Sequence, residues 1–365
     1  MAVTYAVDGV SYSSINAACT AIEASHDYST DGIANIEIQQ VYEDTAAVTV
    51  DAASAGTPST TNYIKITVAS AYRHSGVYGT GHARLKTTSS SHSMTINEDY
   101  VVVEYLQVEQ AGTTSSAEAI RVVGNHCVIS RNIIKTNNTT QQDGVYPSGA
   151  ITIYADNNVF QDCYRAGLHA QSNAATVVYA DHNTFINCGD EDVLTDPCGG
   201  LGAKQSAVTV NAYNNLAIDC YGATKARGFN KSLSPTWIGD FNISSDQTAS
   251  DTSAEDRFGA TNNWGSVDVT ELTEPTAGEW VWVNDHDASY DVGIKGENTY
   301  TVTQNGTDRS GLEPDPRQDF SIDIVGTTRS APTIGAFEYV VVGGAVATAI
   351  LKNNLGVNLF RGTTL

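Results

Sequence analysis

The chain has 365 residues, 41% of them hydrophobic and 16% charged, with a formal net charge of −22 at pH 7. This hydrophobic content is enough for a buried core and argues against a disordered chain. The acidic balance repels the phosphates of nucleic acids and anionic membranes, so neither is an expected partner.

Residues 1–30 are expected to form an N-terminal strand and a capping helix. In "SYSSINAACTAIEASH" either Ser13 or Ser14 can cap a helix. Its apolar residues recur at helical spacing and predict one buried face, made by Ile15, Ala18, Cys19 and Ile22. The preceding residues show no basic region followed by an apolar one, so no secretory signal peptide is expected.

Residues 31–243 contain a repeat. "DNNVFQDC" at 156–163 returns as "DHNTFINC" at 181–188 and, more loosely, as "AYNNLAIDC" at 212–220. Spacings of 26, 25, 32 and 27 residues separate the anchoring asparagines Asn132, Asn158, Asn183, Asn215 and Asn242. Such a fixed period is typical of solenoid proteins.

Each repeat shows short apolar–polar alternation with β-branched residues, and no helical pattern lies between repeats. This predicts an all-β fold, a right-handed parallel β-helix in which each turn stacks on the next. Asn132, Asn158, Asn183 and Asn215 should form a hydrogen-bonded ladder at a bend, where Asn tolerates the left-handed conformation. Inside the coil we expect a stack of Phe160 and Phe185 and a column of reduced thiols from Cys163, Cys188 and Cys220.

The regular pattern ends after residue 243. Residues 244–339 are expected to form an irregular, β-rich closing region, a small C-terminal extension of the solenoid. Residues 340–365 read as an apolar tail for oligomerisation or attachment. Its most apolar stretch is too short and too rich in glycine for a membrane span.

An insertion in the longest repeat, "GDEDVLTDPCGGLGAKQ", is the best candidate for chemistry. Its carboxylates could bind a structural Ca²⁺ through Asp190, Glu191, Asp192 and Asp196. The alternative is a solvated acidic loop. If the protein is an enzyme, the expected catalytic residues are Lys204, one turn away, with Arg165 and His169 on the neighbouring turn.

Two further features are expected to be structural. "DGVYPSG" at 143–149 reads as a projecting loop that exposes Tyr146. His182 in "DHNTF" reads as a stacked surface residue in preference to a general base.

Residues 1 to about 340 resemble the pectate-lyase-like group of right-handed β-helix proteins. The resemblance rests on the N-terminal "YSSINAACTAI", the Asn-anchored repeats and the ending "DIVGTTRSAPTIGAFEY". It implies the fold, whereas the group's activities include lyases, hydrolases, epimerases and non-catalytic fibres. The hydrolases of this fold are similar to one another in a Gly-His-Gly and an Arg-x-Lys, and neither occurs here.

The N-terminus and the tail "GVNLFRGTTL" also resemble those of bacteriophage structural proteins. This resemblance implies a non-catalytic virion surface protein, such as a head decoration, fibre or tailspike-like protein. Such a protein would be assembled in the host cytoplasm as a homotrimer that contacts other virion proteins and binds glycans. The alternative is a polysaccharide lyase or hydrolase on the same scaffold.

Overall fold

The computed structural model describes most of the first 244 residues and parts of the remainder. The described ranges are 2–52, 55–76, 78–137, 141–171, 174–189, 198–218, 220, 227–240, 242–244, 309–329 and 335–336. To these are added six short strands, β25 (Leu272–Thr273), β26 (Val281–Trp282), β27 (Gly293–Lys295), β28 (Thr299–Thr301), β29 (Val341–Val342) and β30 (Ala345–Val346).

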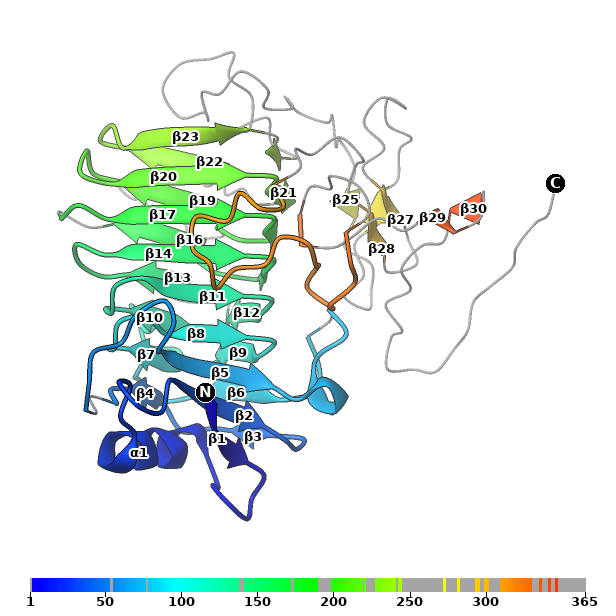
Figure 1. Cartoon of the computed structure of the whole chain (residues 1–365). Helices are drawn as coiled ribbons and strands as arrows, with labels where there is room; N and C mark the ends of the chain where they lie inside the picture. Colours follow the sequence, from blue (N-terminus) through cyan, green and yellow to red (C-terminus); the bar gives the residue numbers. More distant parts are fainter. Residues whose placement is uncertain are drawn as a thin grey trace.

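Three long parallel sheets wind into a right-handed β-solenoid of about eight turns (Figure 1). The prediction of a parallel β-helix is therefore confirmed. In each regular turn the chain passes through a seven-stranded, then a nine-stranded, then an eight-stranded sheet. Consecutive turns pair in register, so Asp156 lies opposite Asp181 and Phe160 opposite Phe185.

The nine-stranded sheet follows the solenoid from its first turn. In spatial order it contains β1 (Ala2–Val7), β2 (Ile33–Ile38), β5 (Ile64–Val68), β8 (Val102–Glu104), β11 (Cys127–Ser130), β14 (Thr152–Asp156), β17 (Val177–Asp181), β20 (Thr209–Tyr213) and β23 (Thr236–Asp240).

The other two sheets complete each turn. The seven-stranded sheet contains β4 (Val48–Val50), β7 (Met94–Ile96), β10 (Ile120–Val122), β13 (Asp143–Pro147), β16 (Ala166–Gln171), β19 (Gly199–Lys204) and β22 (Arg227–Ser232). The eight-stranded sheet contains β3 (Glu43–Asp44), β6 (Arg84–Thr87), β9 (Gln107–Gln110), β12 (Ile133–Thr136), β15 (Val159–Gln161), β18 (Thr184–Ile186), β21 (Leu216–Ile218) and β24 (Ile243–Ser244).

The helix α1 (Ile15–Ser25) lies at the N-terminal end of the solenoid (Figure 1). The Ser14 hydroxyl accepts a hydrogen bond from the amide of Ala17, which begins the helix. The buried residues of α1 are the four apolar ones expected from the spacing, Ile15, Ala18, Cys19 and Ile22. A 3₁₀ turn, η1 (Ser70–Tyr72), follows β5.

The interior is apolar and closely packed. The rings of Phe160 and Phe185 stack with centroids 4.8 Å apart, and all six cysteines are buried and unoxidised. Burial raises the pKa of the Cys163 thiol well above its usual value.

A column of glycines faces this aromatic stack. A Cβ added to Gly167 would lie 2.6 Å from Cδ1 of Phe185, and one added to Gly144 would lie 3.0 Å from Cδ1 of Phe160. Because these distances leave no room for a methyl group, the aromatic stack depends on the absence of side chains on the facing strands.

The bend between the nine- and eight-stranded sheets carries a column of buried asparagines. Asn158 donates from its backbone amide to Oδ1 of Asn183, at 3.1 Å, and from its side chain to the same atom at 3.0 Å. The same pair of bonds joins Asn132 to Asn158, Asn183 to Asn215 and Asn215 to Asn242. Each asparagine therefore holds the turn to its neighbour.

The left-handed residue of this bend precedes the asparagine. The φ angles of Arg131, Asn157, His182 and Asn214 are 57°, 55°, 53° and 54°. Our expectation that the ladder asparagines adopt this conformation was wrong by one residue. The left-handed residue turns the chain from the nine-stranded into the eight-stranded sheet, and the following Asn can then point into the bend, where its amide reaches the next turn.

Candidate functional site

Asp143, Arg165 and His169 form a buried polar cluster on the seven-stranded sheet. His169 alternates along β16 with Leu168 and Ala170, which belong to the core, so its side chain points away from the interior. Arg165 immediately precedes the same strand. The structure thus brings together two of the residues predicted as catalytic and adds Asp143, which the sequence did not indicate.

Asp143 is the centre of this cluster and is 0% exposed. The Arg165 guanidinium donates to both carboxylate oxygens, with Nε 3.0 Å from Oδ1 and 3.1 Å from Oδ2. Nδ1 of His169 lies 3.2 Å from Oδ2. Burial alone would raise the pKa of Asp143, but the charge of Arg165 and the contact with His169 outweigh it and hold the pKa at about 2.

His169 is oriented by that carboxylate. Asp143 is ionised at neutral pH and can only accept, so Nδ1 of His169 carries the proton and donates. The ring is 0% exposed and lies edge-on to the ring of Tyr146, with centroids 6.0 Å apart. Within the described part of the chain, Nε2 is a buried atom without a hydrogen-bond partner. Nε2 is therefore the one ring nitrogen of His169 that the described contacts leave for a hydrogen bond with a ligand.

The structure places the remaining predicted site residues on the next strand or outside the described residues. Lys204 ends β19 and pairs in register with Gln171, two positions beyond the pair of His169 with Gly202. Asp190, Glu191, Asp192 and Asp196 lie outside the described residues. Among the residues that are described, no group of three or more His, Cys, Asp or Glu side chains could hold a metal ion.

The interpretation of residues 143–149 as a projecting loop was wrong. Asp143–Pro147 is the strand β13, in the middle of the seven-stranded sheet. Tyr146 is half-buried, and its hydroxyl donates to the backbone oxygen of Gln171 at 2.9 Å. Glycine and proline suggested a turn, but Gly144 is required here because a Cβ would lie 2.4 Å from the backbone oxygen of Gly167 and 3.0 Å from Cδ1 of Phe160.

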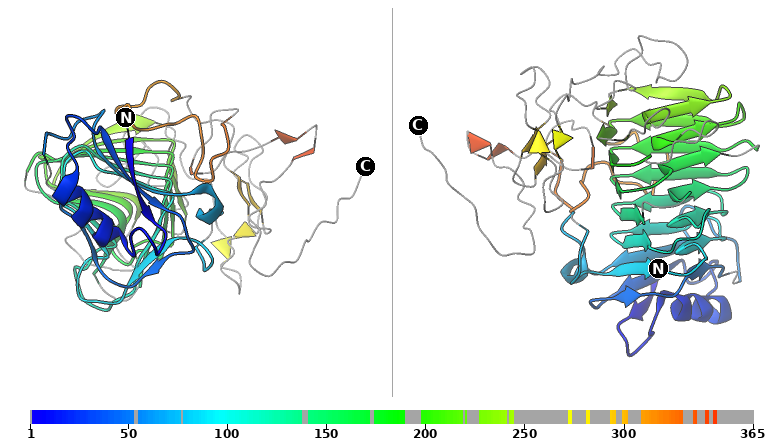
Figure 2. Two further views of the ribbon diagram at one scale, coloured as in Figure 1. Left: turned by 60° about the horizontal axis from the view of Figure 1, so that its bottom comes forward. Right: turned by 180° about the vertical axis from the view of Figure 1, so that it is seen from behind.

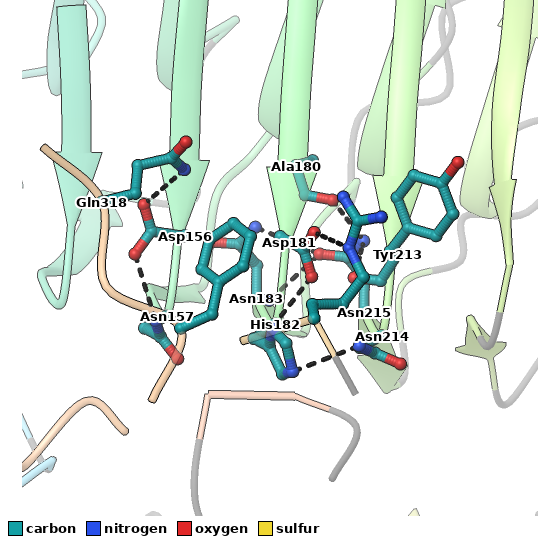
Figure 3. Close-up of polar contacts among 12 residues, drawn as sticks. Asp156, Asn157, Ala180, Asp181, His182, Asn183, Tyr213, Asn214, Asn215 and Gln318 are labelled. Atoms are coloured by element: carbon teal, nitrogen blue, oxygen red, sulfur yellow. Dashed lines mark hydrogen bonds and ion pairs between the residues drawn. The ribbon is translucent and has the colours of Figure 1, made fainter. Parts of the chain in front are cut away.

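A second polar cluster occupies the bend beside the asparagine column (Figure 3). Asp156 is 0% exposed and accepts hydrogen bonds from Ser130 (2.6 Å), Asn157 (3.0 Å) and Gln318 (2.8 Å). Burial raises the pKa of Asp156, although the charge of Arg131 and these donors oppose the shift. Gln318 belongs to a segment that is far away in sequence.

Asp181 and His182 continue this cluster on the next turn (Figure 3). Nε of Arg309 lies 3.0 Å from Oδ2 of Asp181, and its guanidinium lies 3.9 Å from the ring centroid of Tyr213. His182 is 2% exposed, with Nδ1 2.8 Å from Oδ1 of Asp181 and Nε2 3.1 Å from Nδ2 of Asn214. The prediction that His182 lies on the surface was therefore wrong. Burial and the charge of Arg329 lower the pKa of His182.

We call residues 309–329 together with 335–336 the strap, because they run along the outside of the solenoid over its middle turns (Figures 1 and 2). Arg329 donates to the side chain of Asn157 at 2.6 Å, and Arg131 donates to the backbone oxygen of Asp319 at 2.5 Å. The guanidinium of Arg317 lies 5.2 Å from the ring centroid of Tyr100. The chain also docks through its backbone, since the amide of Gly335 donates to the oxygen of Asn214 at 2.6 Å.

The nine-stranded sheet carries a second, smaller apolar cluster on its outer side. Val102 is 2%, Val128 0% and Tyr154 6% exposed, and the three pair in register on neighbouring strands. They alternate along β8, β11 and β14 with residues of the main core. The strap contacts this sheet near the apolar cluster. Arg317 donates to the backbone oxygen of His126, and Gln318 donates to the carboxylate of Asp156.

In comparisons with known proteins, no family model, curated protein or solved structure matches the chain significantly. In the part of the chain that the structure describes, no helix is long and apolar enough to span a membrane.

Proposed function

We propose that this chain is a non-catalytic structural protein of the bacteriophage virion surface, a head decoration, fibre or tailspike-like protein. The observation that carries the proposal is that the protein itself engages its buried carboxylates. Asp143 is held by Arg165, Asp156 by three donors, and Asp181 by Arg309. Groups held in this way stabilise a rigid body.

The shape of the molecule agrees with this role. Parallel sheets that continue through about eight turns make an elongated, stiff body. The apolar tail at residues 340–365 is the proposed contact with other virion proteins or around the axis of a homotrimer. Glycans of the host or its surroundings are the proposed ligands.

The experiment is to incubate the purified chain with a panel of acidic and neutral polysaccharides. Binding is followed by co-sedimentation, and cleavage by new reducing ends and by the absorbance of unsaturated sugars. The proposal expects binding to at least one polysaccharide and no cleavage of any. Cleavage that is lost in His169→Gln would overturn it.

The alternative is a polysaccharide lyase or hydrolase, and one observation favours it. His169 is oriented by Asp143 and has a buried Nε2 without a hydrogen-bond partner among the described residues. An imidazole oriented in this way is suited to act as a general base. Lys204, on the neighbouring strand β19, would be its companion, and Lys204→Ala should then abolish sugar release.

The Ca²⁺ site at Asp190, Glu191, Asp192 and Asp196 also remains a proposal. Calcium titration of the full chain by calorimetry tests it. The heat of binding should disappear in a variant with Asp190→Asn and Asp192→Asn, while its melting temperature without calcium stays close to that of the wild type.

A further inference from the structure

His182 lies where the strap crosses the bend of the solenoid (Figure 3). It is the left-handed residue of its turn, and the equivalent residues of the two neighbouring turns are Asn157 and Asn214. The ring is 2% exposed, and its centroid lies 5.7 Å from that of Phe320 in the strap. The strap therefore packs against a side chain that can gain a charge, at a position where the neighbouring turns have neutral amides.

The hydrogen bond between His182 and Asn214 requires the neutral ring. Nε2 of His182 lies 3.1 Å from Nδ2 of Asn214. Because an amide nitrogen only donates, Nε2 accepts, and the proton of the neutral ring is on Nδ1, 2.8 Å from Oδ1 of Asp181. An added proton goes to Nε2, where two donors would then face one another. Protonation thus removes a buried hydrogen bond.

The charges around His182 also oppose protonation. Asp181 is the carboxylate beside the ring, and it already accepts a hydrogen bond from Nε of Arg309 at 3.0 Å. Arg329 is the second cation, and it donates to the uncharged side chain of Asn157. A charged His182 would be a third cation beside one carboxylate, which is costly in a buried position. Burial and, after it, the charge of Arg329 accordingly lower the pKa of His182.

The other carboxylates near this contact do not compensate the charge. Asp156, one turn before Asp181, accepts from Gln318. Burial raises the pKa of Asp156, so acid favours its docked form and acts in the opposite direction to His182. The described carboxylates of the strap have partners within the strap: the amide of Phe320 for Glu313, Arg317 for Asp315, Ser321 for Asp319, and the amides of Val325 and Thr327 for Asp323.

We propose that the strap is an acid-operated latch, which opens when His182 is protonated. The pKa of His182 in the docked protein is lower than its ordinary value of 6.5. Its contribution to docking is therefore fully present above pH 6.5 and is lost as the pH falls through the lowered value. Opening uncovers the carboxylates of Asp156 and Asp181 on the solenoid. The latch does not depend on whether the chain is a virion protein or an enzyme.

Hydrogen–deuterium exchange of the full chain at pH 7.5 and pH 5.0 tests this. Labelling times are lengthened at pH 5.0 to compensate for the slower chemical exchange. The reporters are the amides of Gly335 and Ala336, which donate to the backbone oxygen of Asn214 and to Oγ1 of Thr184. Their protection should fall about tenfold at pH 5.0. The amide of Asn183, in the asparagine column, is the internal reference and should keep its protection.

Two variants should hold the latch closed at pH 5.0. His182→Asn gives this turn the residue of both neighbouring turns and removes the titratable group. Asn214→Asp places a carboxylate where it can accept from a protonated Nε2. The matched control is His126→Asn. His126 is also left-handed, with a φ of 56°, and its backbone oxygen accepts from Arg317 of the strap, so this variant should open like the wild type.

Three results would overturn the latch. The first is equal protection of Gly335 and Ala336 at the two pH values in the wild type. The second is opening at pH 5.0 that persists unchanged in both His182→Asn and Asn214→Asp. The third comes from the unsubstituted protein, in which NMR of labelled histidine rings follows the titration of His182. Its midpoint should coincide with opening, and a ring that stays neutral while the strap opens would exclude His182 as the trigger.

Discussion

Gln318 donates a hydrogen bond of 2.8 Å to Asp156, although 162 residues separate them in sequence. Asp156 is 0% exposed, so this donor replaces part of the hydration that the carboxylate loses on folding. The contact joins the strap to the middle of the solenoid. It makes the stability of the regular turns depend on a segment without any repeat pattern.

The first prediction concerns this contact. Gln318→Ala should lower the free energy of unfolding by about 1–2 kcal/mol, because a buried carboxylate loses one of its three donors. Urea denaturation measures the change. Leu312→Ala, in the strap but 58% exposed, should leave the stability within about 0.5 kcal/mol of the wild type. Equal effects of the two variants would contradict the role of Gln318.

The second prediction concerns the asparagine column. The Asn183 side chain accepts two hydrogen bonds from Asn158 and donates to Ala155 and Asn215. Asn183→Ala should cost about 2–4 kcal/mol, since the buried backbone amide of Asn158 and the backbone oxygen of Ala155 both lose a hydrogen-bond partner. Asn211→Ala, at a half-buried position of β20, is the matched control and should cost much less. A column that tolerates Asn183→Ala would not be holding the turns together.

The third prediction separates the two partners of the buried ion pair. Arg165→Met should destabilise the protein by about 3–5 kcal/mol, because it leaves the carboxylate of Asp143 buried without its cation. Adding Asp143→Asn should recover much of this loss, since the amide carries no charge. If the double variant is as unstable as Arg165→Met, the loss comes from packing and not from the unpaired charge.

The fourth prediction is a pH dependence. The pKa of Asp143 is about 2 in the folded protein, against an ordinary value of 3.8. A depressed pKa contributes stability that is fully present above pH 3.8 and is lost as the pH falls through 2. Its size is about 2 kcal/mol. The difference in unfolding free energy between the wild type and Asp143→Asn should shrink by this amount between pH 5 and pH 2. A difference that is constant over this range would exclude the shift.

The fifth prediction concerns the glycine column. Gly167→Ala should lower stability by about 1–3 kcal/mol, because its methyl group would lie 2.6 Å from the Phe185 ring. In a background with Phe185→Leu the same substitution should cost less, because the smaller side chain leaves space. Thermal denaturation of the four variants measures the coupling. Purely additive effects would show that the ring is not the obstacle.

The periodic part of this fold could be predicted from the sequence. Asn158, Phe160 and Cys163 recur 25 residues later as Asn183, Phe185 and Cys188. Because neighbouring strands are parallel, residues separated by this spacing lie on top of one another, as Phe160 and Phe185 do. The left-handed residue could not be placed in the same way. Tyr, Arg, Asn and His all occupy it, because backbone conformation and not side-chain chemistry is what the bend requires there.

The polar clusters were harder to predict, for two physical reasons. Asp143 and Gly144 look like a turn in isolation, since the packing that demands the glycine comes from the backbone of Gly167 on the next turn and from Phe160 on another sheet. The strap contacts join residues 121 to 191 positions apart. Its irregular sequence shows no alternation that could indicate a docking face. Arg165 and His169 were found only because both fall on one repeat next to the insertion.

The most direct test of the proposed virion role is to label phage particles with antibodies raised against the purified chain. Particles purified from the host culture are examined by electron microscopy after gold labelling, and their proteins are quantified by mass spectrometry. The proposal predicts labels on the particle surface and a copy number in fixed ratio to the capsid protein. Unlabelled particles that lack the chain, with the protein found instead in the medium together with polysaccharide-cleaving activity, would contradict it.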